Sequence, residues 1–103
     1  MVGARIAWTE NERVNTMKIT KDTFVTRIDE EGIWKNETNT VINFLEWFAQ
    51  AEYDLDKIDE EEYEKIISEY KNESDDMLLL SLENYGESYG FYFLDMNGKI
   101  IFK

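Results

Sequence analysis

The sequence predicts an α+β fold in which a two-helix layer covers one face of an antiparallel β-sheet, with the element order β-β-β-α-α-β-β-β. Two observations lead to this prediction. Apolar residues recur at helical spacing between residues 40 and 71, whereas the segments on either side are short, rich in β-branched or aromatic residues, and bounded by turn residues. Strands grouped around a helical segment are typical of α+β proteins. The length of 103 residues predicts one domain, residues 1–103.

The first third of the chain predicts strands and turns. An apolar run that fits an edge strand is followed by a connecting turn and a second strand, over residues 4–8, 9–13 and 14–20. Residues 23–29 alternate in character and contain several β-branched side chains, so they predict another strand. Residues 29–32, DEEG, predict a hairpin turn in which Gly32 takes the left-handed conformation, and residues 33–35 then form the return strand.

The middle of the chain predicts two helices. Apolar residues at positions 41, 44, 45 and 48 predict a helix over residues 40–51 that packs on the sheet. A second, acidic helix is predicted over residues 58–71, because Asp59 can cap it and Glu62 completes a capping box. The link over residues 53–57 is short, which makes the two helices antiparallel or sharply angled neighbours.

The last third again predicts strands. Residues 77–82, MLLLSL, form an apolar run of strand length, and Gly86 and Gly90 mark a turn after it. Residues 89–94 and 99–102 flank the sequence DMNG, whose Asn-Gly pair is a strong hairpin signal. The sequence therefore predicts a C-terminal β-hairpin.

Composition excludes several kinds of chemistry. The chain contains no cysteine and no histidine, so it has no disulfide, no thiolate site and no histidine base or metal ligand. Asp54, Asp56 and Asp59 suggest calcium, but their spacing lacks the glycine and the ligand positions of an EF-hand loop. No phosphate-binding or nucleophile motif is present. We therefore expect no enzyme activity, no catalytic residue, no cofactor and no metal.

The sequence also predicts a cytoplasmic protein. No apolar run reaches membrane-spanning length, and the first residues lack the long apolar segment of a signal peptide. The absence of cysteine fits a reducing compartment.

Negative charge is concentrated in the helical segment. The formal net charge is −12, and residues 37–76 contain fourteen acidic residues against three lysines. Residues 1–36, in contrast, contain six acidic and six basic residues. A field of this kind repels nucleic acid and anionic membranes and attracts a basic protein surface, so we expect neither direct nucleic-acid binding nor membrane binding.

Carboxylates on one helix face lie about 5–6 Å apart, a separation comparable to that of successive phosphates along a nucleic-acid strand. The predicted partner-binding residues are the acids of the second helix, of the link before it and of the hairpin turn: Glu30, Glu31, Asp54, Asp56, Asp59, Glu60, Glu61 and Glu64. An acidic face that only keeps the protein soluble explains the same residues.

Aromatic residues have two interpretations as well. Phe44, Trp47 and Phe48 could contact a partner, but their spacing matches one buried helix face and favours core packing. A second aromatic group between residues 85 and 93 could stack on bases, but binding nucleic acid also requires cations that this protein lacks.

Three segments resemble a known family. RIDEEG at residues 27–32, TVINF at 40–44 and DEEEY at 59–63 resemble, in order and spacing, the hairpin, helix and acidic second helix of small phage anti-CRISPR proteins that inhibit type II CRISPR nucleases. The resemblance covers residues 27–70. It implies a DNA mimic that occupies the site where the nuclease reads the PAM after the guide RNA is loaded. Asp59 and Glu60 would then face the PAM-reading arginines, and Glu31 would meet another basic group. The resemblance also implies that, if the gene belongs to a phage, the compartment is the cytoplasm of the host cell.

This chain departs from the family at both ends. The family's initial helix has no counterpart in residues 1–20, and residues 77–103 add a predicted hairpin where the family stops.

The leading hypothesis is thus an inhibitor that acts by occupancy of a basic surface on a nucleic-acid-binding enzyme, foremost a type II CRISPR nuclease with its guide RNA. An immunity protein that neutralises a basic toxin, such as a ribonuclease, would use the same acids. An enzyme that relies on carboxylates alone is a third alternative.

Overall fold

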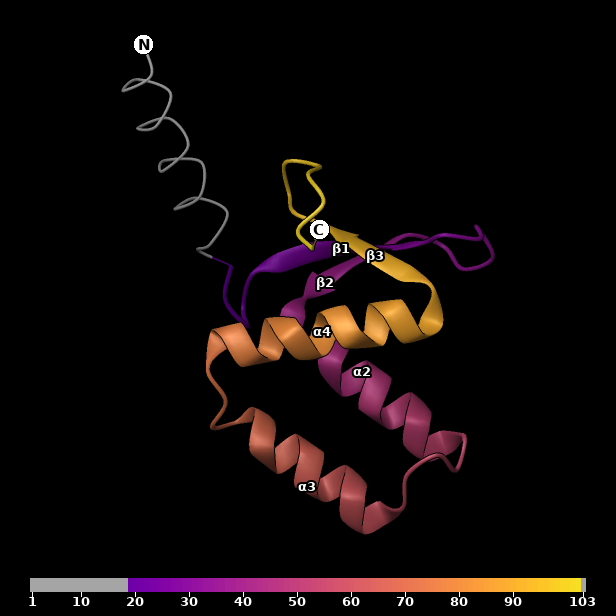
Figure 1. The fold of residues 1–103 in the computed structure, drawn as a ribbon, viewed down its shortest axis with the longest axis vertical. Coiled ribbons are helices and arrows are strands. Elements are labelled where there is room, and N and C mark those ends of the chain that lie inside the picture. The colour runs from indigo at the N-terminus through magenta and orange to yellow at the C-terminus, as the bar shows by residue number, and fades with distance from the viewer. Residues whose placement is uncertain (1–18, 103) are drawn as a thin grey trace.

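The computed structural model describes residues 19–102, which form three strands and three helices. Their order is β1 (Phe24–Asp29), β2 (Glu37–Thr40), α2 (Val41–Asp54), α3 (Glu60–Tyr70), α4 (Asp75–Tyr89) and β3 (Phe91–Leu94) (Figure 1). The fold is α+β, as the sequence predicts, but the order of these elements is β-β-α-α-α-β. The strand predicted over residues 4–8 and the turn over 9–13 lie outside the described residues, as does most of the strand over 14–20; Ile19 and Thr20 are not in a strand.

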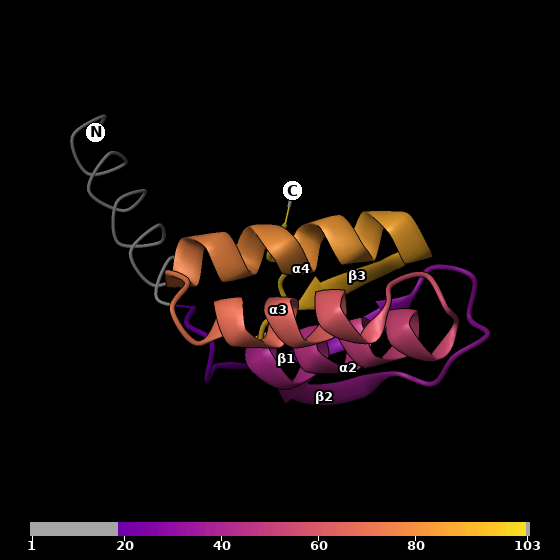
Figure 2. The ribbon, with the colours of Figure 1, turned by 90° about the horizontal axis from the view of Figure 1, so that it is seen from below.

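The sheet is antiparallel throughout, with the strand order β2-β1-β3. Arg27, in the central strand, is opposite Glu37 of β2 and Phe93 of β3. Helices cover the face that carries Val25 and Arg27, both buried, whereas Phe24 points to the other face and is 52% exposed. On this face of the sheet, α2 and α4 pack against the strands and against each other. Helix α3 packs on α2 at the side away from the sheet (Figures 1 and 2).

Helix α2 is the centre of the core. Thr40 caps it, because the Thr40 hydroxyl accepts a hydrogen bond from the Asn43 N–H. Its buried side chains are Val41, Phe44, Leu45, Phe48 and Ala49. The predicted packing of Phe44 and Phe48 in the core is confirmed, but Trp47 is 39% exposed.

The strand predicted over residues 77–82 and the turn at Gly86 are wrong, because both belong to α4. Ser74 caps this helix, and its buried residues Leu78, Leu82 and Gly86 recur every four positions, which is helical periodicity. Gly86 lets the helix approach β3, since a Cβ there would lie 2.8 Å from the Phe91 carbonyl oxygen. Gly90 ends the helix in the left-handed conformation, with φ of 79°.

The return strand predicted over residues 33–35 is also wrong. Strand β2 begins at Glu37, and residues 30–36 form a longer loop. The carboxylate of Asp29 organises this loop by accepting hydrogen bonds from the N–H groups of Glu31, Ile33 and Trp34. These backbone groups are therefore not available for pairing with β1.

The turn predicted at DMNG is present, but the hairpin is not complete. The Gly98 N–H donates to the Asp95 carbonyl, and Gly98 has a φ of 84°. Beyond the turn, the described residues form one isolated bridge, between Leu94 and Ile100, instead of the strand predicted over 99–102.

Candidate partner-binding surface

The α2–α3 connection carries the largest group of predicted binding residues, which we call the acidic corner: Asp54, Asp56, Asp59, Glu60, Glu61 and Glu64. Helix α2 ends where the Leu55 N–H donates to the Ala51 carbonyl. Asp56 then takes a positive φ of 62°, a conformation that aspartate tolerates better than most residues. The turn brings the acids at the end of α2 beside those at the start of α3.

Asp59 has a structural role in the corner. One oxygen of its carboxylate accepts a hydrogen bond of 2.8 Å from the Glu62 N–H, which caps α3 as the sequence predicts. Glu60 and Glu61 follow in the first turn, where negative charge suits the positive end of the helix dipole. The N-terminus of α3 thus stabilises the negative charges of Asp59, Glu60 and Glu61.

All six side chains of the acidic corner are exposed. Within residues 19–102, none of their carboxylates forms an ion pair. Residues 54–64 contain one base, Lys57, and its ammonium lies 3.2 Å from the Tyr89 hydroxyl and 4.7 Å from the centre of the Tyr89 ring. The corner therefore presents several carboxylates whose charge nearby lysines and arginines do not neutralise.

Glu30 and Glu31 belong to a different part of the surface. They lie at the start of the loop over residues 30–36, which is on the same side of the molecule as the acidic corner but next to the sheet (Figures 1 and 2). Glu30 lines a hollow together with Glu83 and Glu87 of α4. The structure therefore separates the eight predicted residues into a group of six and a group of two.

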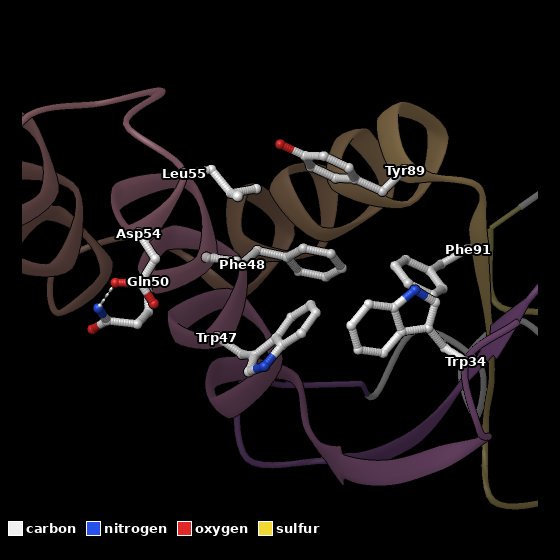
Figure 3. A pocket seen from close by; sticks show the side chains of 9 residues that line it. Trp34, Trp47, Phe48, Gln50, Asp54, Leu55, Tyr89 and Phe91 are labelled. Atoms are coloured by element: carbon white, nitrogen blue, oxygen red, sulfur yellow. Dashed lines mark hydrogen bonds between the residues drawn. The ribbon is translucent and has the colours of Figure 1, made fainter.

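An aromatic groove of about 530 Å³ lies between these two groups (Figure 3). Its apolar lining comes from the loop over residues 30–36, the C-terminal half of α2, and the junction of α4 with β3: Trp34, Trp47, Phe48, Ala51, Leu55, Tyr89 and Phe91. Trp34 is 55% exposed and Leu55 is 65% exposed. Large apolar side chains exposed side by side on a small protein indicate a binding surface.

A buried arginine, Arg27, lies against the rings that line the groove. Arg27 is 3% exposed, and the centre of its guanidinium lies 4.8 Å from the Phe91 ring centre, 5.1 Å from that of Trp47 and 5.9 Å from that of Trp34. The guanidinium donates to the Lys35 carbonyl and lies 3.5 Å from the Glu37 carboxylate, while the buried Nε has no hydrogen-bond partner. Arg27 thereby fixes the inner side of the same rings that line the groove.

Asp54 joins the acidic corner to the groove, since it belongs to both. Its carboxylate accepts a hydrogen bond of 2.9 Å from the Gln50 amide, and the Gln50 oxygen accepts one of 3.0 Å from the Tyr63 hydroxyl. Figure 3 shows Gln50 and Asp54 at one end of the groove, with the tryptophan rings further along it. The pair of hydrogen bonds holds one carboxylate oxygen in place and leaves the other available.

A hydrogen bond also fixes the side chain of Tyr89. Its hydroxyl donates a hydrogen bond of 2.7 Å to Glu52, and burial together with this hydrogen bond raises the pKa of the hydroxyl. The ring consequently has a fixed position at the edge of the groove.

Sequence reasoning missed the groove and the roles of Asp29 and Arg27. Trp34 was a usable signal, because a tryptophan three residues after a run of three acids is unusual for a turn. Arg27 gave no such signal, since an arginine in a short strand is normally exposed.

The described residues contain no group of acids arranged to hold a metal ion. Across residues 19–102, every helix is too short or too polar to cross a lipid bilayer. Comparisons with protein-family models, with curated proteins and with solved structures find no match.

Proposed function

We propose that this protein is an inhibitor that occupies a basic surface on a nucleic-acid-binding enzyme. The acidic corner supports this proposal, because its carboxylates are exposed and lack ion-pair partners within the described residues. Carboxylates in this state can form charge-assisted hydrogen bonds with arginine and lysine side chains of a partner. Their mutual repulsion opposes folding, so a binding role offers a reason for their presence.

The target that we propose is a type II CRISPR nuclease loaded with its guide RNA. Carboxylates about 5–6 Å apart on a helix can substitute for the phosphates next to the PAM, where the nuclease presents arginine side chains. Asp59 and Glu60 would face those arginines and Glu31 would meet a further basic group. This binding requires no catalytic residue, cofactor or direct contact with nucleic acid.

The first experiment is gel filtration of the protein with the guide-loaded nuclease, with and without a PAM-containing duplex. We expect co-elution at low salt that the duplex prevents, since both ligands would use one site. Co-elution should weaken as salt increases, because exposed charges are screened. No co-elution at low salt would reject this target.

Charge variants then test which surface binds. The variant D59N/E60K/E61K makes the acidic corner more positive by five charges, and asparagine keeps the cap of α3. The matched control E69K/E73K/D76N makes the same change in exposed residues around the α3–α4 connection. We expect the first variant to lose binding by more than tenfold relative to the control, with both still folded. Equal inhibition by the two would contradict the proposal.

An immunity protein for a basic toxin is the second candidate. The aromatic groove favours it, since exposed tryptophan and leucine side chains suit a tight, lasting protein complex. A toxin reading frame directly upstream of the gene would support this candidate, whereas a phage or plasmid setting would support the first. The same charge variants then report on inhibition of the toxin.

A further inference from the structure

The aromatic groove combines two features that together select a cation. Trp34 and Trp47 offer aromatic rings, and Asp54 places a carboxylate at one end. Aromatic ring faces attract cations, and a carboxylate adds a charged hydrogen-bond acceptor. The groove volume of about 530 Å³ is within the range of about 300–1,000 Å³ that is usual for ligand pockets.

We infer that the aromatic groove binds the guanidinium of one arginine side chain from the partner. The partner class rests on the proposed function, which requires a basic surface, whereas the choice of arginine comes from the groove itself. The arginine side chain extends along the rings of the groove, and its guanidinium lies toward Asp54, which has one carboxylate oxygen that the Gln50 amide does not contact.

Arginine fits better than lysine for a physical reason. A guanidinium is planar, stacks on aromatic rings and is weakly hydrated, whereas an ammonium is compact and strongly hydrated. Entry into a groove lined mainly by apolar side chains costs hydration, so the weakly hydrated cation has the advantage. An apolar side chain would also fit the rings, but it would leave one Asp54 oxygen desolvated without a hydrogen-bond partner.

Among residues 19–102, the cations Arg27 and Lys57 lie close to the groove, and both already have partners. Arg27 is on the inner side of the rings and lies 3.5 Å from Glu37. Lys57 lies against Tyr89, whose hydroxyl also contacts Glu52. With Asp54 in the lining and the acidic corner next to it, the local charge remains negative and complements a basic partner.

Tryptophan fluorescence can measure this binding directly. The chain has three tryptophans, and the variant W8F leaves the two that line the groove. The probes are three hexapeptides in which glycine alternates with arginine, with lysine or with citrulline; citrulline keeps the shape of arginine without its charge. We expect the arginine peptide to change the fluorescence and to bind at least fivefold more tightly than the lysine peptide, and the citrulline peptide to bind weakest.

Variants in the W8F background locate the site. D54N removes the charge and keeps an oxygen that can accept from Gln50, so it should remove most of the preference for arginine over lysine. E64Q removes the same charge from an exposed acid that does not line the groove, and it should keep the preference. W34A should weaken the arginine peptide more than the lysine peptide.

Two results would overturn the inference. Equal affinity for the arginine and lysine peptides, with D54N and E64Q alike, would mean that binding reports charge alone. Tighter binding of an otherwise equal Gly-Leu peptide would assign the groove to an apolar side chain. The nuclease is absent from this assay, so its outcome is separate from that of the gel-filtration experiment: arginine selectivity without co-elution would reject the target and leave the groove assignment standing.

Discussion

Arg27 and the acidic corner carry charge in opposite ways. Arg27 is buried among aromatic rings and paired with Glu37, so its charge contributes to the packing of the interior. The carboxylates of the acidic corner are exposed, close together and without ion-pair partners within residues 19–102. The charge of Arg27 is therefore used in folding, whereas the charges of the acidic corner remain available for a partner. This difference predicts that substitutions in the two regions will affect different measurements.

The largest effect on stability is expected at Arg27. The variant R27A should lower the free energy of unfolding by about 2–4 kcal/mol, because it leaves a cavity and removes the cation from the rings. The variant R27M fills most of the volume and should cost less than about 1.5 kcal/mol. Urea unfolding measures both. The exposed Lys65 is the control, since K65A should change stability by no more than about 0.5 kcal/mol. Similar values for R27A and K65A would show that the buried contacts of Arg27 do not matter.

A smaller effect on stability is expected at Asp59, whose carboxylate both caps α3 and belongs to the exposed acidic corner. The variant D59A removes the cap of α3 and should cost about 1 kcal/mol, whereas D59N keeps an acceptor oxygen and should cost much less. Both variants lose the charge, so both should weaken binding to a basic partner. Urea unfolding separates the two contributions. Equal destabilisation by D59A and D59N would mean that the charge itself, and not the cap, stabilises the helix.

The smallest effect on global stability is expected at Asp29, which orders the exposed loop over residues 30–36. Hydrogen bonds from the N–H groups of Glu31, Trp34 and Ile33 lower the pKa of this carboxyl below its ordinary value of 3.8. Because the folded pKa is lower than the unfolded one, the stabilisation is fully present above pH 3.8 and is lost as the pH falls through the folded pKa.

Tryptophan fluorescence is the measurement for Asp29, because Trp34 lies in the loop that this carboxylate orders. In the W8F background, acidification below about pH 4 should change the emission as the loop loosens, since protonation removes the charged acceptor. The variant D29A should show the altered emission already at neutral pH, while the helices remain folded by circular dichroism. An unchanged spectrum in D29A would show that the loop holds its shape without this carboxylate.

Local signals were sufficient for part of the fold. Helical spacing predicted α2, and helical spacing with the Asp59 cap predicted α3, each to within a few residues; β-branched alternation predicted β1. The prediction failed for α4, because MLLLSL has no polar residue in its first four positions and is therefore compatible with a buried strand or a buried helix. The capping signal of Ser74, followed by Asp75 and Asp76, was the local indication that favoured a helix.

The candidate site was predicted in composition but not in arrangement. The exposure of the eight acids follows from their charge and their periodicity, both of which are visible in the sequence. Their division into two groups depends on how the loop over residues 30–36 and the α2–α3 connection lie in space. The groove between them is formed by Trp34, Trp47 and Tyr89, which come from segments far apart in the chain.

The sequence by itself determined the concentration of acids, the approximate positions of α2 and α3, and the Asn-Gly turn, because each depends on residues close together along the chain. Tertiary structure decided that residues 77–82 belong to a helix, that Arg27 is buried and that the aromatic groove exists. These features depend on contacts between distant segments, such as Gly86 against Phe91 and Arg27 against Trp47. Burial and packing between such segments outweigh local propensity, and no local pattern records them.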